Sequence, residues 1–487
     1  MNIELQVIGS ALRAIAEEMG VVLIRSAFSA NIKERRDCST ALFDERGRMV
    51  VQAEHIPVHL GAMPDAVAAV MRCDPGPNDV FILNDPFTGG THLPDITLVS
   101  RTALGFAASR AHHADVGGVE PGSMPATSRT LDEEGVVIPP TRIDDATVEA
   151  LVAQMRNPDE RRGDLRAQRA AQRVAARRID DVCARHGRER VRAAMDELYA
   201  YSERLVRAGI AAMPDGRYEA ADLLDDGTKI QVALSIDGES IELDFAGTDA
   251  QQRDGNLNCP LAVTRSAAYF VVRCLAAPDV PASGGAFAPV TVRAPEGSLV
   301  NARPPAAVAG GNVETSSRIV DAVFAAFGQA VPVPAQGQGT MNNLTLGNDR
   351  FTYYETIGGG QGACPDADGP SGVHVTMSNT LTTPVEALEL SYPLHVERYA
   401  LRRGSGGAGA HRGGDGVVRE LRALEDCRLS ILSERRTRAP RGANGGGDGA
   451  AGRNLLNGRE LPGKVTVQLH AGDVVTIETP GGGGHGG

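Results

Sequence analysis

Histidine and aspartate residues gather in the first quarter of the chain. Five of the eleven histidines lie between His55 and His113, and Asp85, Asp95 and Asp115 lie in the same region. The run His92-Leu93-Pro94-Asp95 places an imidazole and a carboxylate three residues apart, and Ala111-His112-His113-Ala114-Asp115 adds further nitrogen and oxygen donors. Two histidines and one carboxylate suit a catalytic divalent metal such as zinc, manganese or iron, because they leave coordination positions open.

The same residues have a second interpretation. Aspartate caps turns, and histidine often bonds to a backbone carbonyl, so the cluster could stabilise loops instead of binding a metal. The run His55-Ile56-Pro57-Val58-His59 could join the site, but a buried loop is the favoured interpretation. The motifs GxSxG, HExxH and the P-loop are absent, so the sequence predicts no ATP site of a recognisable kind.

Two glycine-rich stretches are candidates for an anion site. Gly358, Gly359, Gly360 and Gln361, followed by Gly362, and the segment 403–416 offer backbone N–H groups that no side chain obstructs. Bulges and turns are the alternative, since glycine runs are common there. The run Asn312-Val313-Glu314-Thr315 is interpreted as the N-terminal cap of a helix.

Periodicity predicts the elements that position these residues. Apolar residues at helical spacing predict a helix over 3–28, and alternation predicts a hairpin over 39–52. Strands at 80–83 and 96–99 enclose the loop 84–95. Between 144 and 213 arginine, alanine and acidic residues predict long helices. From 216 onward short β-prone runs dominate, interrupted by helices at 262–276 and 316–327, and the glycine-rich tail 481–487 is expected to be too flexible to pack alone.

These elements predict an α+β fold in three regions. They are a mixed α/β metal-site region (1–143), a helical segment (144–215) and a mainly β region with two embedded helices (216–487). The net charge of −12 argues against a nucleic-acid partner. No apolar run is long enough for a membrane span or a signal peptide, and seven scattered cysteines argue against a disulfide framework. We therefore expect a cytoplasmic protein.

Nine runs of the sequence, in order along almost the whole chain, resemble the hydantoinase B/5-oxoprolinase family. They are SANIKERRDCSTALFD (29–44), AEHIPVHLGAMP (53–64), NDPFTGGTHLPDITLV (84–99), AHHADVGG (111–118), PGSMPATS (121–128), GNVETSSRIVD (311–321), GGGQGA (358–363), GSGGAGAHRGGDGVVRE (404–420) and ETPGGGG (478–484). The resemblance implies a metal held by His92, Asp95 and His112. It also implies a hetero-oligomer with a hydantoinase A-type subunit that binds and uses ATP.

The resemblance further implies ATP-dependent opening of a cyclic amide, such as a hydantoin or 5-oxoproline. Phosphorylation of the amide oxygen would activate the ring for attack by water, and a divalent ion lowers the pKa of water to about 7 in favourable sites. Asp115 and His113 are then candidates for the base or for a group that orients a ligand imidazole. Carboxylation of a ketone is the alternative reaction, and a non-enzymatic scaffold is the alternative role.

The chain departs from the family pattern at one motif. Relatives commonly show His-x-His-Met-Thr-Asn where this chain has His374-Val375-Thr376-Met377-Ser378-Asn379, so one histidine of the pair is replaced. A substrate different from that of the relatives is one consequence of such a change. The carboxylase large subunits are also considerably longer than 487 residues, which favours the amidohydrolase branch.

Overall fold

The N-terminal region is an antiparallel sheet covered by helices on both faces. The computed structural model describes residues 3–53 and 56–487. The sheet has six strands in the order β2-β1-β5-β4-β3-β6. Their bounds are β1 (Cys38–Asp44), β2 (Met49–Ala53), β3 (Val80–Leu83), β4 (Asp95–Thr102), β5 (Gly105–His112) and β6 (Thr141–Arg142). The predicted hairpin and the strand pair around the loop 84–95 are therefore both present.

Alternating side chains explain why helices cover both faces of this sheet. Leu42, Ala107 and Ala111 pack with apolar residues of α1 (Ile3–Ser26) and α6 (Pro158–His186). Phe43 and Ala108 pack on the opposite face, in the same cluster as residues of α3 (Met63–Met71). Short helices connect these elements: α2 (Ala30–Lys33), α4 (Leu131–Glu134) and 3-10 turns at Pro57–His59 and Pro86–Thr88.

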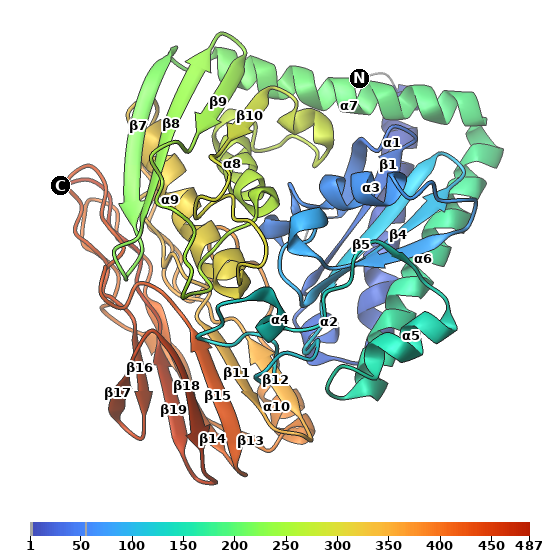
Figure 1. The fold of residues 1–487 in the computed structure, drawn as a ribbon. Coiled ribbons are helices and arrows are strands. Elements are labelled where there is room, and N and C mark those ends of the chain that lie inside the picture. Colours follow the sequence, from blue (N-terminus) through green and yellow to red (C-terminus); the bar gives the residue numbers. More distant parts are fainter. Residues whose placement is uncertain (1–2, 54–55) are drawn as a thin grey trace.

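Three helices occupy the segment predicted to be helical. They are α5 (Asp145–Val152), α6 and α7 (Arg188–Ala211). Helix α6 lies against β4 and β5, whereas α7 extends from the N-terminal sheet to the second sheet (Figure 1). None of the helices in the described ranges 3–53 and 56–487 is long and apolar enough to cross a membrane.

The middle of the chain is a second sheet packed on two helices. Strands β10 (Val290–Arg293), β9 (Ser240–Asp244), β8 (Lys229–Asp237) and β7 (Gly216–Leu223) follow in that order. Helices α8 (Leu261–Ala276) and α9 (Ser316–Phe327) match the two predicted embedded helices, and a 3-10 turn lies at Gly284–Phe287. The prediction of a cap at 312–315 is wrong: Gly311–Thr315 form a π-helical turn that continues into α9, and no side chain caps α9.

The C-terminal part consists of two further sheets, drawn in orange and red in Figure 1. One has the order β12-β11-β15-β18, and the other β13-β14-β19-β16-β17. Their bounds are β11 (Asn343–Gly347), β12 (Thr352–Glu355), β13 (Leu394–Arg402), β14 (Gly416–Ala423), β15 (Cys427–Leu432), β16 (Arg453–Leu456), β17 (Arg459–Leu461), β18 (Lys464–Leu469) and β19 (Val474–Glu478), with α10 at Val385–Ser391. The mixture of helices and separate sheets confirms the predicted α+β class.

Glycine-rich segments pack against one another beside these sheets. The tail, which the sequence predicted to be too flexible to pack alone, is mostly buried, and its backbone bonds to other glycine-rich segments. Gly482 N donates to Gly414 O, and Gly484 N donates to Gly447 O, both at 2.9 Å. Such contacts require glycine, because a Cβ added at Gly360 would lie 2.0 Å from Gly414 O.

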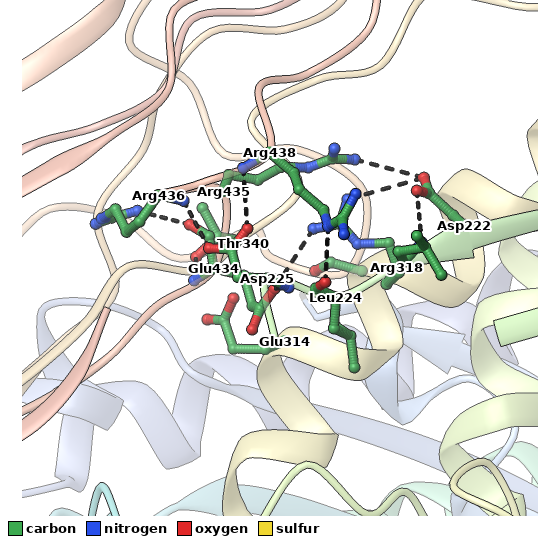
Figure 2. A network of polar contacts seen from close by, with 12 residues as sticks. Asp222, Leu224, Asp225, Glu314, Arg318, Thr340, Glu434, Arg435, Arg436 and Arg438 are labelled. Carbon is green, nitrogen blue, oxygen red and sulfur yellow. Dashed lines mark hydrogen bonds and ion pairs between the residues drawn. The ribbon is translucent and has the colours of Figure 1, made fainter. Parts of the chain in front are cut away.

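A buried network of charged side chains joins the second sheet to the C-terminal part (Figure 2). Arg318 of α9 lies 3.8 Å from a carboxylate oxygen of Asp222 at the end of β7, and 3.8 Å from one of Glu434, which follows β15. Arg435 donates to Asp321 at 2.5 Å, and the backbone N of Arg436 donates to Asp225 at 2.7 Å. These ion pairs fix α9, and with it the turn at 311–315, relative to both sheets.

Candidate metal centre

The strand register brings the three predicted ligands together. Asp95 is the first residue of β4 and His112 the last of β5, and the two face each other across the antiparallel ladder. His92 lies one turn before Asp95, because Asp95 N donates to His92 O. His92 Nε2 is 3.2 Å from Asp95 Oδ2, and His112 Nδ1 is 3.4 Å from Asp95 Oδ1. Each side chain offers one ligand atom, and these atoms lie within 4.8 Å of one another.

His59 joins the same centre. Its Nε2 lies 3.6 Å from Asp95 Oδ2, and its Nδ1 forms a hydrogen bond of 2.9 Å with Ser39 Oγ. The sequence favoured a buried loop here, and the structure shows that the buried loop carries its histidine to the carboxylate. His55 lies outside the described residues.

The electrostatics of the centre favour an ionised carboxylate. Burial alone would raise the pKa of Asp95, but His92, His112 and His59 surround it and hold the pKa well below its ordinary value. Burial lowers the pKa of His59, so this imidazole is neutral at pH 7. Metal binding requires an ionised carboxylate and neutral imidazoles, and Asp95 and His59 meet this requirement.

The donor atoms fit a metal ion. Within the described part of the chain, His92 Nδ1 and Nε2, His112 Nε2 and His59 Nε2 are buried without a hydrogen-bond partner. Leaving buried polar nitrogens unsatisfied costs about 1–3 kcal/mol each, and coordination removes that cost. The ring of His112 also stacks on Tyr354 with centroids 4.5 Å apart, which fixes its orientation. The set of imidazoles around one carboxylate suits a divalent transition metal.

A small cavity opens beside the centre. It has a volume of about 20 Å³, which is room for about one water. Its walls include Asp37, Tyr354, Thr356, Ser378 and Thr380, which are distant in sequence from the histidine cluster. Sequence reasoning did not single out these residues, and their only signal was that Asp37 lies in the family-like run 29–44 and Ser378 in the motif 374–379. Burial raises the pKa of Asp37 to about 6, with His112 opposing the shift.

The roles predicted for His113 and Asp115 do not match their contacts. His113 follows His112 directly and turns to the opposite side, where Nε2 bonds to Gln168 Oε1 of α6 at 3.0 Å. Burial lowers the pKa of His113 to about 4. The Asp115 carboxylate accepts from the N–H groups of Gly117 and Gly122, both at 2.7 Å, and pairs with Arg156. Both residues therefore hold the local structure and do not orient a ligand imidazole.

The glycines predicted to bind an anion use their N–H groups within the protein. Gly359 N donates to Val373 O, Gly360 N to Pro480 O and Gln361 N to Pro370 O, at 2.8 to 3.0 Å. Gly358 packs closely against the backbone of Val373. A nest needs convergent N–H groups that are free, and three of these are already committed. The anion-site prediction for Gly358, Gly359, Gly360 and Gln361 is therefore replaced by a packing role.

The chain is similar in sequence to a 5-oxoprolinase and to an uncharacterised archaeal protein. The chain is 40% identical to 5-oxoprolinase 1 of Arabidopsis thaliana, an alignment that covers 99% of this chain and 42% of the plant protein. It is also 40% identical to an uncharacterised protein of Methanocaldococcus jannaschii, of which it covers 90%. The chain thus spans about two fifths of the length of the plant 5-oxoprolinase.

Two solved structures share the fold. The ATP-dependent caprolactamase from Pseudomonas jessenii superposes with a TM-score of 0.91 at 26% identity, covering 99% of this chain and 91% of that one. A nucleotide-free acetone carboxylase superposes with a TM-score of 0.86 at 18% identity, covering 99% and 75%. The family model described as hydantoinase B/oxoprolinase matches residues 1–487. The chain therefore belongs to the hydantoinase B/oxoprolinase family.

Proposed function

We propose that this chain is the metal-bearing subunit of an ATP-dependent hydrolase that opens a hydantoin or a 5-oxoproline-like ring. The observation that carries the proposal is the buried centre of His92, Asp95 and His112, in a chain whose relatives include a 5-oxoprolinase and an ATP-dependent caprolactamase. An amide carbonyl is a poor electrophile, so ATP is needed to activate it. A hydantoinase A-type partner would supply that step.

The chain's own residues divide the remaining work. His92, Asp95 and His112 would hold the divalent ion, whose Lewis acidity makes water a better nucleophile near neutral pH. His59 packs against Asp95 and helps to keep its carboxylate ionised. Asp37 borders the same cavity as this ligand set, so its carboxyl group is the candidate to accept a hydrogen bond from the attacking water and orient it.

A ketone carboxylase subunit is the second candidate function. It rests on the fold that the chain shares with acetone carboxylase. The two candidates separate in one assay, in which the chain and a hydantoinase A-type subunit receive ATP with a hydantoin, 5-oxoproline or caprolactam, or with acetone and bicarbonate. Ring opening supports the proposal, whereas consumption of bicarbonate with acetone supports the second candidate.

Metal analysis tests the centre itself. We expect the purified chain to carry close to one divalent transition metal, and His92→Ala to lose it while the protein stays folded, because a ligand in a loop contributes little to the core. His470→Ala is the matched control, since His470 is largely exposed and far along the sequence from the centre. Active wild-type protein that contains no metal would contradict the proposal.

The division of labour gives a further test. The chain alone should neither hydrolyse ATP nor open a hydantoin, because it lacks a P-loop, and addition of the partner should restore both activities. ATP hydrolysis by the isolated chain would contradict this assignment.

A further inference from the structure

Four side chains form a continuous hydrogen-bonded chain beside the metal centre. Thr356 Oγ1 lies 2.8 Å from Thr380 Oγ1, and Thr380 Oγ1 lies 3.2 Å from His374 Nε2. His374 Nδ1 lies 2.6 Å from Ser378 Oγ. Thr356, Thr380 and Ser378 are buried, and all three line the cavity next to His92 and Asp95. Both ends of this hydrogen-bonded series therefore border the cavity beside the metal centre.

Arg35 makes the two links at Thr380 run in the same direction. Its Nη2 donates to Thr356 Oγ1 at 2.6 Å and to Thr380 Oγ1 at 2.9 Å. A hydroxyl group has one hydrogen and two lone pairs. Thr380 Oγ1 has three partners, so it accepts from Arg35, accepts from one neighbour and donates to the other. If Thr356 donates to Thr380, then Thr380 must donate to His374. If His374 instead donates to Thr380, then Thr380 must donate to Thr356.

The imidazole of His374 is neutral. Burial and the nearby Arg35 charge lower the pKa of His374 to about 3, so the ring carries one N–H at neutral pH. With one N–H and three hydroxyl hydrogens, the four side chains have four hydrogens for the three hydrogen bonds that link them. The fourth hydrogen takes no part in a link. Ser378 carries it when Thr356 donates to Thr380, and Thr356 carries it when Thr380 donates to Thr356. The two directions differ by the tautomer of His374.

We propose that Thr356, Thr380, His374 and Ser378 form a proton relay that serves ring opening, an inference that rests on the function proposed above. Water forms its bond to the ring carbon and loses a proton to Thr356. Each member of the relay passes one proton on, and Ser378 gives its proton to the ring nitrogen. That nitrogen has received the electron pair of the activated C=N bond, so the relayed proton neutralises it. The C–N bond then breaks with its electron pair on the nitrogen, which takes the proton of the new hydroxyl group through solvent, and a second water hydrolyses the remaining acyl phosphate and releases phosphate. The relay resets when Ser378 takes a proton from solvent and Thr356 releases one.

Substitution of Thr380 tests the relay in the assembled enzyme. Thr380→Val breaks two links, so single-turnover ring opening should slow by at least about 100-fold, the contribution usual for positioned proton transfer. The metal content should be unchanged. Thr380→Ser keeps the hydroxyl group and should restore most of the rate. Thr352→Val is the control, because Thr352 Oγ1 is buried without a hydrogen-bond partner among the described residues.

Solvent isotope effects add a readout that a structural role would not change. In mixtures of H2O and D2O, a plot of the wild-type rate against the deuterium fraction should be curved, as expected when several protons move in one step. The residual rate of Thr380→Val should depend on it linearly. Equal ring-opening rates for Thr380→Val and Thr352→Val, or equal curvature in wild type and Thr380→Val, would overturn the proposal.

The tautomer of His374 tests the relay without any activity. With histidine labelled by ¹⁵N, NMR of the folded chain should show His374 exchanging between both neutral tautomers. Thr356→Val leaves Thr380 no other acceptor than His374 Nε2, so it should lock the ring as the Nδ1–H tautomer, although Thr356 itself does not contact the imidazole and bonds to Arg35 and Thr380. An unchanged tautomer ratio would overturn the relay. Lack of ring opening by the wild-type pair, with the tautomer shift present, would instead overturn the proposed function.

Discussion

Glu314 should make the stability of the protein depend on pH. It lies fully buried in the turn before α9, where Oε1 accepts from Met341 N and from Asn343 Nδ2. Oε2 has no hydrogen-bond partner among the described residues. Burial, reinforced by the charge of Glu434, raises the pKa of Glu314 to about 8 despite opposing hydrogen bonds. The folded protein therefore holds a proton on Glu314 at neutral pH.

The size of the effect follows from the two pKa values. An unfolded chain releases this proton near pH 4.5, whereas the folded chain releases it near pH 8. Within that window the folded state binds more protons, so the free energy of unfolding falls as pH rises, by about 1.4 kcal/mol for each pH unit. The stabilising contribution is complete below pH 4.5 and is lost by pH 8. The upper bound over the whole window is roughly 5 kcal/mol.

Glu314→Gln removes this dependence, because glutamine keeps an accepting oxygen for Met341 and Asn343 and has no proton to lose. We expect the urea midpoint of the variant to rise relative to wild type between pH 5 and pH 8. Glu434, whose pKa burial raises to about 7, leaves a smaller dependence in the variant. Glu386→Gln, on the exposed face of α10, is the matched control. If the midpoints of wild type and Glu314→Gln run parallel over this range, the reasoning about Glu314 is refuted.

Three further predictions concern positions where the structure changed or extended the sequence-based interpretation. Asp115→Asn should lower the free energy of unfolding by about 1.5–3 kcal/mol, because it weakens charged hydrogen bonds to Gly117, Gly122 and Arg156, and it should keep its metal. A folded Asp115→Asn protein without metal would show that Asp115 takes part in metal binding. Tyr354→Ala should weaken metal binding about 10–100-fold in a metal titration, because it releases the ring of His112. Tyr354→Phe keeps the stacking and should bind the metal normally. Equal metal affinities of Tyr354→Ala and Tyr354→Phe would show that stacking does not matter. Gly360→Ala should destabilise the protein by about 1–3 kcal/mol in thermal unfolding, because its Cβ meets Gly414 O at 2.0 Å. Gly447→Ala should be tolerated, since the nearest atom to its Cβ is 3.4 Å away. Wild-type stability of Gly360→Ala would refute the packing role.

The sequence by itself determined the helices and strands that carry the centre. Period-3.6 apolar patterns predicted α1, α8 and α9 almost to the residue. The proximity of His92 and Asp95 could also be predicted from the sequence, since residues three positions apart in a tight loop stay close in any fold. His112 could be placed with them only through the family resemblance, because the register of β4 against β5 decides that it faces Asp95.

Only the tertiary structure decided which neighbours of the ligands take part. His112 and His113 are adjacent in sequence, but successive side chains of a strand point to opposite faces, and α6 covers the face that receives His113. His59, Asp37 and the relay residues reach the cavity from distant segments, and hydrogen bonds from Arg35 span 321 positions to Thr356 and 345 positions to Thr380. The glycine segments offered free N–H groups in the sequence, and their partners became visible only when distant backbones were packed together. Local spacing fixes geometry within a turn, whereas the partners of a side chain or an N–H group depend on what the fold brings against it.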